Sequence, residues 1–249
     1  MPSDVNERFN LYPASIGSGV PPAVWKMIYL ARRNPALAAP DFAQAWREHS
    51  ALGRQCTNVG QRIKAVAQCA RILDTQEWPE LHTGYDGVNL MVLADRAAGT
   101  AIWSDPQTQS IMRPDEPRVF DGYVRDFSML CREHVLHHTP GTPQWPVIGD
   151  VLLLGFLQKK PGWSGPMAAP REVPLAWRQG SLSRARRVVC NVIEDEPPAG
   201  YGYGCIVEWW MGSMQEAQTA AESAYVAATN RSDWGEHVLM LTQVTHCRA

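Results

Sequence analysis

One histidine on an aromatic stripe is the residue of this sequence best placed to do chemistry. Phe42, Trp46 and His49 are spaced i, i+4 and i+7, so an α-helix over residues 40–52 would place all three on one face, and Gly53 stands where such a helix commonly ends. Imidazole titrates near neutral pH and can accept or donate a proton. A buried histidine can equally be a core residue that one hydrogen bond satisfies. This helix alone leaves both interpretations open.

Three further side chains could join His49 in acid/base chemistry, and each has a structural alternative. Asp86 precedes Gly87 and is either a catalytic acid or a turn residue bonded to its own backbone. Tyr29 either offers its hydroxyl to a substrate or fills the core. His134 faces either a pocket or the helices. The candidates for substrate binding are Trp46, Phe42, Met27, Leu90 and Arg132.

Other motifs of catalysis receive less support. His137 and His138 have no carboxylate or cysteine at ligand spacing, which favours exposed residues over a metal site. Glu208 lies inside the apolar run IVEWWM, so it must either pair with Arg187 or Arg178 or hold a raised pKa. The sequence contains no Gly-rich phosphate loop, no dinucleotide-binding fingerprint and no G-x-S-x-G elbow. We therefore expect chemistry without a cofactor.

Composition places the chain among ordinary globular proteins. Its 249 residues, 45% of them apolar, can form one large domain or two small ones. A net charge of -2 gives no basic footprint for nucleic acid or an anionic membrane. The start MPSDVNERFN lacks the pattern of a signal peptide, and the six cysteines form no CxxC pair. We expect a cytoplasmic protein with free thiols.

The elements that must position these residues form a repeat. Residues 1–22 read as an arm rich in Pro, Gly and Ser. The first half, residues 23–140, is predicted to run βαββαβ, the ferredoxin-like order. Its elements are strand 25–31, helix 40–52, a run at 61–73 that fits a strand or a helix, strand 88–93, helix 96–103 and strand 128–137.

The second half, residues 146–249, repeats this order after a joint rich in Pro and Gly. Its predicted elements are strand 150–158, helix 173–182, strands 187–193 and 204–211, helix 214–227 and strand 237–246. The segment VPLAWRQGSL mirrors FAQAWREHSAL, with Trp177 in place of Trp46. An internal duplication is the economical explanation.

The strands also predict how the halves meet. In residues 28–31, 88–93 and 151–154 the side chains directed to either face of the sheet are apolar. In a sheet with one face in solvent, apolar and polar residues would alternate along each strand. Both faces must therefore be covered. Helices can cover one face and the sheet of the companion half the other, in a closed or nearly closed α+β barrel.

The first half resembles the EthD domain of the dimeric α+β barrel superfamily. Trp46, Arg47 and His49 resemble its W-R-x-x-H signature, and Tyr85-Asp86-Gly87-Val88 resembles its Y-D-G-V strand entry. Asp115-Glu116 with Phe120 resembles the segment after its second helix, and Arg132-Glu133-His134-Val135 its closing strand. The resemblance implies a tandem protein, an internal pseudo-dimer of two ferredoxin-like halves packed sheet to sheet.

The second half departs from this pattern, because Gly180 stands in the place of His49. We therefore predict one functional cavity, in the first half, and a closed space in the second. Trp209 and Trp210 point to opposite faces of one strand, so one of them can plug that space on either side.

The resemblance implies an apolar cavity that holds an aromatic or polyketide-like substrate beside one histidine, although the fold does not choose the activity. The expected function is a cofactor-independent lyase or cyclase that performs decarboxylation or dehydration, with His49 as proton shuttle and Asp86 or Tyr29 as its partner. The alternatives are a cofactor-free oxygenase of an electron-rich phenol and a binding protein that shelters a hydrophobic intermediate. Pairing of the chain into a homodimer stays open.

Overall fold

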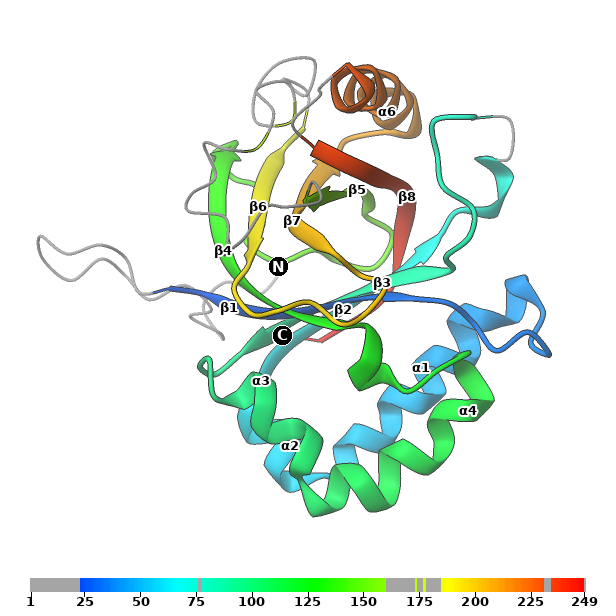
Figure 1. The fold of residues 1–249 in the computed structure, drawn as a ribbon, viewed down its shortest axis with the longest axis vertical. Helices are drawn as coiled ribbons and strands as arrows, with labels where there is room; N and C mark the ends of the chain where they lie inside the picture. Colours follow the sequence, from blue (N-terminus) through cyan, green and yellow to red (C-terminus); the bar gives the residue numbers. More distant parts are fainter. Residues whose placement is uncertain are drawn as a thin grey trace, which may run out of the picture.

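A closed antiparallel barrel of eight strands forms the centre of the described part of the chain (Figure 1). The computed structural model describes residues 23–75, 78–159, 173, 177, 185–230 and 234–248. The strands are β1 (Trp25–Ala31), β2 (Ile63–Arg71), β3 (Gly87–Leu93), β4 (Ser128–His138), β5 (Val151–Lys159), β6 (Arg187–Ile193), β7 (Tyr203–Met211) and β8 (Trp234–Arg248). Each lies where an apolar run of the sequence placed it.

The barrel repeats one strand arrangement twice. Its order is β1-β3-β2-β8-β5-β7-β6-β4, and β4 pairs with β1 to close it. The first four strands therefore stand in the order β4-β1-β3-β2 and the last four in the order β8-β5-β7-β6. The two groups join edge to edge through β2 with β8 and β4 with β6. Each sheet was expected to cover one face of the other. In the structure the two sheets enclose one barrel interior, and hydrogen bonds between β2 and β8 and between β4 and β6 close it.

The barrel explains why its strands are apolar on both parities. Ile28 and Leu30 of β1 point into the interior cluster, whereas Met27 and Tyr29 belong to the cluster between the sheet and the helices. Side chains of a strand alternate between its faces. Because both faces are covered here, both parities have to be apolar.

A buried ionic network inside the barrel ties the two halves together. The ammonium nitrogen of Lys26 on β1 lies 2.7 Å from Oε1 of Glu208 on β7 and 2.5 Å from Oε2 of Glu133 on β4. Arg187, one of the predicted partners of Glu208, donates to Glu133 instead. Burial alone would raise the pKa of Glu208, but Lys26 and a hydrogen bond from Asn191 outweigh it, and the pKa lies below its ordinary value.

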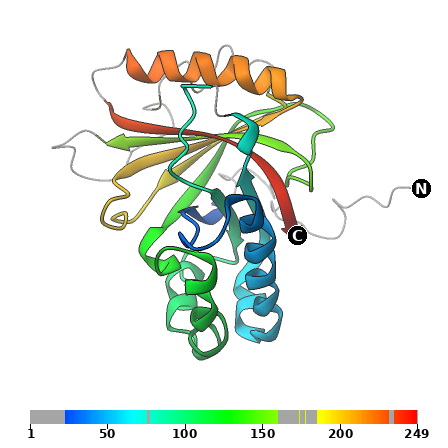
Figure 2. The same cartoon turned by 90° about the vertical axis from the view of Figure 1, so that its right-hand side faces the viewer.

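Helices cover the outer faces of both halves (Figure 2). The layer over the first half consists of α1 (Phe42–Leu52), α2 (Thr57–Arg62), α3 (Ala98–Ala101), a π-helical turn at Thr108–Met112, α4 (Glu116–Val119) and intervening 3-10 turns. Over the second half, α6 (Met214–Thr229) lies across the sheet. None of the described helices is long and apolar enough to cross a membrane.

The helix predictions succeed where the element is long. The helix predicted over residues 40–52 is confirmed as α1, and the one predicted at 214–227 extends to Thr229 as α6. The run at 61–73 is a strand from Ile63, after the short helix α2. The helix predicted at 96–103 is limited to Ala98–Ala101 and a 3-10 turn, because no apolar stripe sustains it. Residues 1–22 and Gly180 lie outside the described residues.

Candidate active site

Helix α1 presents its aromatic stripe to the sheet, as its spacing predicted. Phe42, Trp46 and His49 are all buried. Trp46 packs so closely on Gly87 of β3 that a Cβ there would lie 2.6 Å from the indole ring. This contact sets the height of α1 above the sheet. One turn further along, the ring of His49 meets that of Phe120 edge to face, with centroids 5.5 Å apart.

A cavity of about 280 Å³ lies between the first-half sheet and its helices, and His49 opens onto it. The sheet contributes Met27, Tyr29, Asn89 and Met91. Seven further wall residues have large apolar side chains: Val59, Ile63, Val66, Ile102, Trp103, Met112 and Val124. Since an apolar cavity of roughly 150 Å³ can hold benzene, this one has room for a planar ligand of about two rings.

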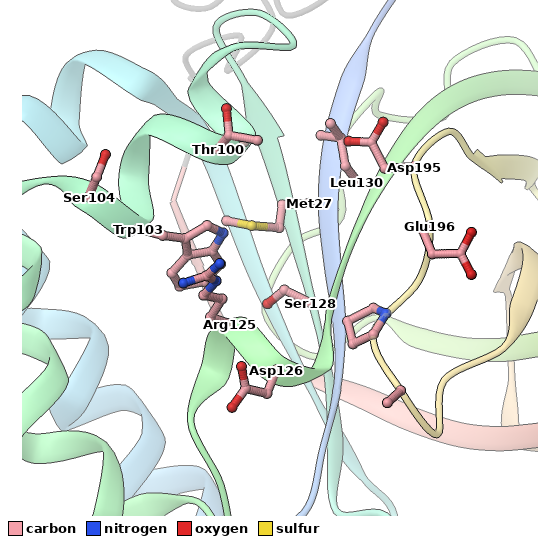
Figure 3. Close-up of a pocket in the computed structure, with 13 residues that line it drawn as sticks. Met27, Thr100, Trp103, Ser104, Arg125, Asp126, Ser128, Leu130, Asp195 and Glu196 are labelled. Atoms are coloured by element: carbon pink, nitrogen blue, oxygen red, sulfur yellow. The ribbon is translucent and has the colours of Figure 1, made fainter.

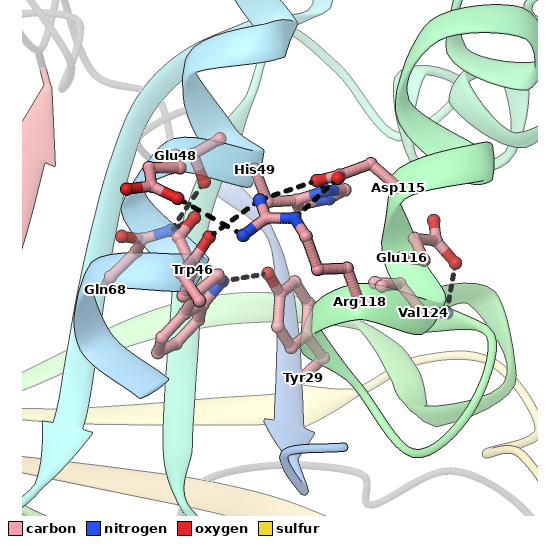
Figure 4. Close-up of polar contacts among 11 residues, drawn as sticks. Tyr29, Trp46, Glu48, His49, Gln68, Asp115, Glu116, Arg118 and Val124 are labelled. Atoms are coloured by element: carbon pink, nitrogen blue, oxygen red, sulfur yellow. Dashed lines mark hydrogen bonds and ion pairs between the residues drawn. The ribbon is translucent and has the colours of Figure 1, made fainter. Parts of the chain in front are cut away.

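His49 forms a dyad with Asp115 (Figure 4). Its Nδ1 lies 3.0 Å from Oδ2 of Asp115. A hydrogen bond from Arg118 and a further one from His49 hold the pKa of Asp115 below its usual range, so this carboxylate is ionised and can only accept. Burial lowers the pKa of His49, and the imidazole is therefore neutral near pH 7. Nδ1 carries the proton, and Nε2 is left as a base.

Glu116 supplies a carboxyl group whose pKa is raised, whereas the pKa of Asp115 is lowered. It follows Asp115 in the chain, lines the same cavity, and is 5% exposed. Burial raises its pKa to about 7, although the backbone N–H of Val124 donates to its Oε2 (Figure 4). A carboxyl group with this pKa is largely protonated at slightly acid pH and can donate a proton. A base and an acid therefore share one apolar cavity.

Two polar side chains of the sheet complete the floor of the cavity. The hydroxyl of Tyr29 accepts a hydrogen bond of 2.9 Å from the indole of Trp46, and burial raises the pKa of Tyr29 well above its ordinary value. Tyr29 is therefore neutral, and its own hydroxyl proton can be donated. Asn89, directly opposite Tyr29 on β3, is buried, and its Oδ1 has no hydrogen-bond partner among the described residues.

The structure brings some predicted site residues together and separates others. His49, Tyr29 and Met27 line the cavity, and Trp46 and Phe42 stand behind them in the same aromatic cluster. Asp86 lies elsewhere. Its carboxylate accepts a hydrogen bond of 2.9 Å from the backbone N–H of Arg33 and pairs with the guanidinium groups of Arg33 and Arg71. This ion-pair cluster gives Asp86 a structural setting at the entry of β3.

Three other predicted residues also lie away from the cavity. Leu90 points into the barrel interior, because its neighbour Asn89 takes the outer face. Arg132 pairs with Glu194 at 2.7 Å across the seam between β4 and β6. His134 is partly buried on β4, with Nε2 unpartnered in the described part of the chain, and burial lowers its pKa.

Glu116 and Asn89 were not predicted as site residues, and the pairing of Asp115 with His49 was not predicted either. Asp115 and Glu116 were noted only as part of the EthD resemblance, because they lie in short turns that have no periodicity. Asn89 did carry a signal, since it is the one polar residue in the run GVNLMVL. A lone amide between buried apolar residues needs a partner, and that partner is a clue to a site.

A larger groove of about 730 Å³ lies beside the cavity and shares Met27 and Trp103 with it (Figure 3). Its polar rim includes Arg125, Asp126, Asp195 and Glu196. These are exposed or partly exposed side chains, and Asp195 pairs with Arg96. Because no histidine lines this groove, we place the candidate site in the smaller cavity. Among the described residues, no group of three His, Cys, Asp or Glu side chains could hold a metal ion.

Comparison with known proteins gives a fold and no family. No family model matches the chain, and no curated protein matches it. A solved structure of a putative monooxygenase from Fusobacterium nucleatum superposes with a TM-score of 0.50 at 7% identity, over 91% of this chain and 93% of that one. A chlorite dismutase from Candidatus Nitrospira defluvii gives 0.47 at 9% identity, over 90% and 91%. At such identities the likeness concerns the fold alone.

Proposed function

We propose that this chain is a cofactor-independent lyase that removes water from a hydroxy carbonyl compound of aromatic or polyketide-like character. One observation carries the proposal: a neutral histidine held by a carboxylate, and a carboxyl group with a pKa of about 7, line the same apolar cavity. Two titratable groups whose environments push their protonation apart indicate a base and an acid. Dehydration needs one of each.

The step balances without an oxidant or reductant. Nε2 of His49 takes a proton from the carbon next to the substrate carbonyl, and the electrons of that C–H bond form the new double bond. The bond to the β-hydroxyl breaks, and Glu116 gives its proton to the leaving oxygen, so water departs. Asp115 stabilises the imidazolium that forms. The proton on His49 then returns to Glu116 through solvent.

Dehydration fits the site better than the other expected lyase step. Decarboxylation needs a desolvated carboxylate and one proton donor, and it would leave the base formed by His49 and Asp115 without a role. Ring closure by an aldol step followed by loss of water uses both groups, and a cyclase therefore falls within the proposal.

The architecture supports a tandem origin within the dimeric α+β barrel class. The two halves repeat one strand order, as two ferredoxin-like units of a pseudo-dimer would. Two segments that resemble the EthD domain, Trp46-Arg47-Glu48-His49 and Asp115-Glu116, supply the base, its partner and the acid. We propose an EthD-like ancestry on these grounds.

A cofactor-free oxygenase is the second candidate. The same base could remove the proton of an electron-rich phenol, and the resulting phenolate would react with oxygen. The neighbour from Fusobacterium nucleatum bears the name of a monooxygenase, but the likeness to it covers the fold alone. Uptake of oxygen with a phenol, measured with an electrode, separates this activity from a lyase.

The proposal can be tested with 4-hydroxy-2-tetralone, a two-ring β-hydroxy ketone that loses water to give 2-naphthol. Wild-type protein should accelerate formation of the fluorescent naphthol over buffer. His49→Gln keeps a hydrogen bond to Asp115 but removes the base, and should lower the rate by about 10²–10⁴-fold. His134→Gln is the matched control, because it removes a histidine with a lowered pKa outside the cavity, and should leave the rate unchanged.

Two results would contradict the proposed function. One is a rate with wild-type protein equal to that in buffer, together with no acceleration of hydrogen–deuterium exchange at the α-carbon of 2-tetralone. The other is a full rate in His49→Gln, which would assign the histidine a structural role.

A further inference from the structure

We infer that the ligand of the His49 cavity is a hydroxy-substituted carboxylic acid, held by Arg54 and Arg248 through its carboxylate and by Asn89 through its hydroxyl. The inference rests on the proposed function only in taking this cavity as the active site. It adds the polar groups that the substrate must carry and where they lie.

The mouth of the cavity is positively charged, and both halves of the chain contribute to it. Arg54 follows α1, and Arg248 ends β8 of the second half. Both are exposed, and both line the cavity. Neither forms an ion pair with another described residue, whereas Arg118 nearby is paired with Asp115 and Glu48. Two guanidinium groups without an anionic partner among the described residues form a site for an external anion.

His246 shows that these arginines converge. It lines the cavity one strand position before Cys247, and its pKa is lowered by burial and then by the charges of Arg47, Arg248 and Arg54. Two cations on or just after α1 and one at the end of β8 therefore lie close enough to act on one ring. The neutral imidazole adds a hydrogen-bonding group to the same mouth.

Deep in the cavity, the chain offers an acceptor that nothing in the described residues uses. Asn89 is 2% exposed, and its Oδ1 is buried without a hydrogen-bond partner. Buried amide oxygens are normally bonded, because leaving one unpaired costs free energy. The neighbouring wall residues Met27 and Met91 cannot donate. A ligand hydroxyl that enters between them supplies the missing donor.

Strand pairing sets the distance between these two features. Asn89 on β3 pairs with Gln68 on β2, and Gln68 pairs with His246 on β8. The buried acceptor on β3 is therefore two strand spacings, or about 10 Å, from His246 at the mouth. A naphthalene skeleton with a hydroxyl at one end and a carboxylate at the other spans a comparable length, and two rings also fit the volume of the cavity.

Calorimetric binding of matched naphthalene compounds tests the inference. The probes are 6-hydroxy-2-naphthoic acid, its carboxamide, 2-naphthoic acid and 2-naphthyl phosphate. We expect the hydroxy acid to bind at least tenfold more tightly than its amide and about tenfold more tightly than the acid without a hydroxyl. The phosphate should bind no more tightly than 2-naphthoic acid.

The variants separate the two contacts. Arg54→Gln combined with Arg248→Gln should remove the preference for acid over amide and keep the preference for the hydroxyl. Asn89→Leu should do the reverse. Arg125→Gln is the matched control, because Arg125 is an exposed arginine that lines the neighbouring groove and not this cavity. It should change neither preference.

Failure of the inference is distinguishable from failure of the proposed function. Equal binding of acid and amide, or unchanged preferences in the variants, would overturn the inference even if dehydration is observed. Tighter binding of the phosphate would overturn the assignment of a carboxylate. If instead the preferences are found and catalysis is not, the ligand assignment stands and the lyase proposal falls.

Discussion

The two halves of the barrel share a strand order and cover their outer faces in different ways. Over the first half, a layer of short helices encloses a cavity with His49 and Glu116 in its walls. Over the second half, the rings of Trp177 and Trp209 pack against each other, with centroids 5.0 Å apart. The helix α6 lies close on that sheet through small buried residues, Ala217, Ala220, Ala221, Ala224 and Ala228. Small side chains permit close approach, and the short helices of the first half leave room.

In both halves, nevertheless, a tryptophan packs against a glycine of the sheet. Trp46 packs on Gly87, and Trp177 packs on Gly155, where a Cβ would lie 2.5 Å from the indole ring. The indole of Trp46 donates to Tyr29 beside the cavity, whereas that of Trp177 donates to the backbone of α6. The tryptophan–glycine contact is therefore shared, and the hydrogen-bond partner of the indole differs between the halves.

The central strand pair of each half shows the chemical difference. In the first half Tyr29 stands opposite Asn89 on the outer face, and in the second Gly155 stands opposite Val207. Of the two tryptophans predicted to plug the second half, Trp209 lies on the outer face, whereas Trp210 belongs to the barrel interior and donates to Glu208. At this strand pair the first half thus carries two polar side chains on its outer face, and the second half carries a glycine and a valine.

The largest effect should come from breaking the dyad of the first half. Asp115→Asn offers an amide that can donate to Nδ1 of His49, which stabilises the tautomer with the proton on Nε2 and removes the base. We expect turnover of the tetralone probe to fall by about 10²–10⁴-fold. Asp86→Asn is the control, because Asp86 sits in an ion-pair cluster away from the cavity, and it should leave kcat unchanged. An equal loss in both variants would argue against a specific dyad.

Trp209→Ala tests whether the second half contributes to stability and not to catalysis. It removes a fully buried indole from the second half, so we expect the free energy of unfolding to fall by about 3–5 kcal/mol in denaturant titrations. Turnover should persist under native conditions, since Trp209 is remote from the cavity in the fold. A loss of kcat in the folded variant would mean that the second half takes part in catalysis.

The pH dependence of kcat/KM should report the two groups of the first half. The acid limb should lie below pH 6.5, because burial lowers the pKa of His49, and the alkaline limb near pH 7, where Glu116 loses its proton. Glu116→Gln should remove the alkaline limb along with much of the rate. A profile that is flat between pH 5 and pH 8 would contradict both assignments.

The contributions of Glu116 and His49 to the free energy of unfolding should change in opposite directions as the pH rises. Glu116 has a raised pKa in the folded state, so its contribution is present below its unfolded pKa of 4.5 and is lost as the pH rises to about 7. His49 has a lowered pKa, so folding loses stability as the pH falls below 6.5. Denaturant titrations of Glu116→Gln should show the first slope removed and the second retained.

The smallest effect is expected at Asn89. Replacing it with Leu removes an unpaired buried oxygen and keeps the approximate shape, so we expect the unliganded protein to become more stable by about 1 kcal/mol. Thermal unfolding of the free protein measures this change. A loss of stability would show that Asn89 supports the fold and is not reserved for a ligand.

Most of the barrel could be predicted from the sequence, because each strand is a local run whose apolar residues occupy both parities. The stripe of α1 was equally local, and it placed His49 correctly. Elements shorter than two turns, such as α4 and the π-helical turn, were not predicted, since so few residues show no period. Asp115 and Glu116 lie in such short elements, so the sequence pattern did not predict their part in the site.

The sequence by itself determined where the strands lie, that both of their faces are covered, and that one helix turns a histidine inward. Only the tertiary structure decided which parity faces the barrel interior, which put Leu90 inside and Asn89 in the cavity. It also joined His49 to Asp115 across 66 residues of chain and set the pKa of Glu116. The physical reason is that register, long-range pairing and burial depend on how the barrel closes, and no local pattern encodes that closure.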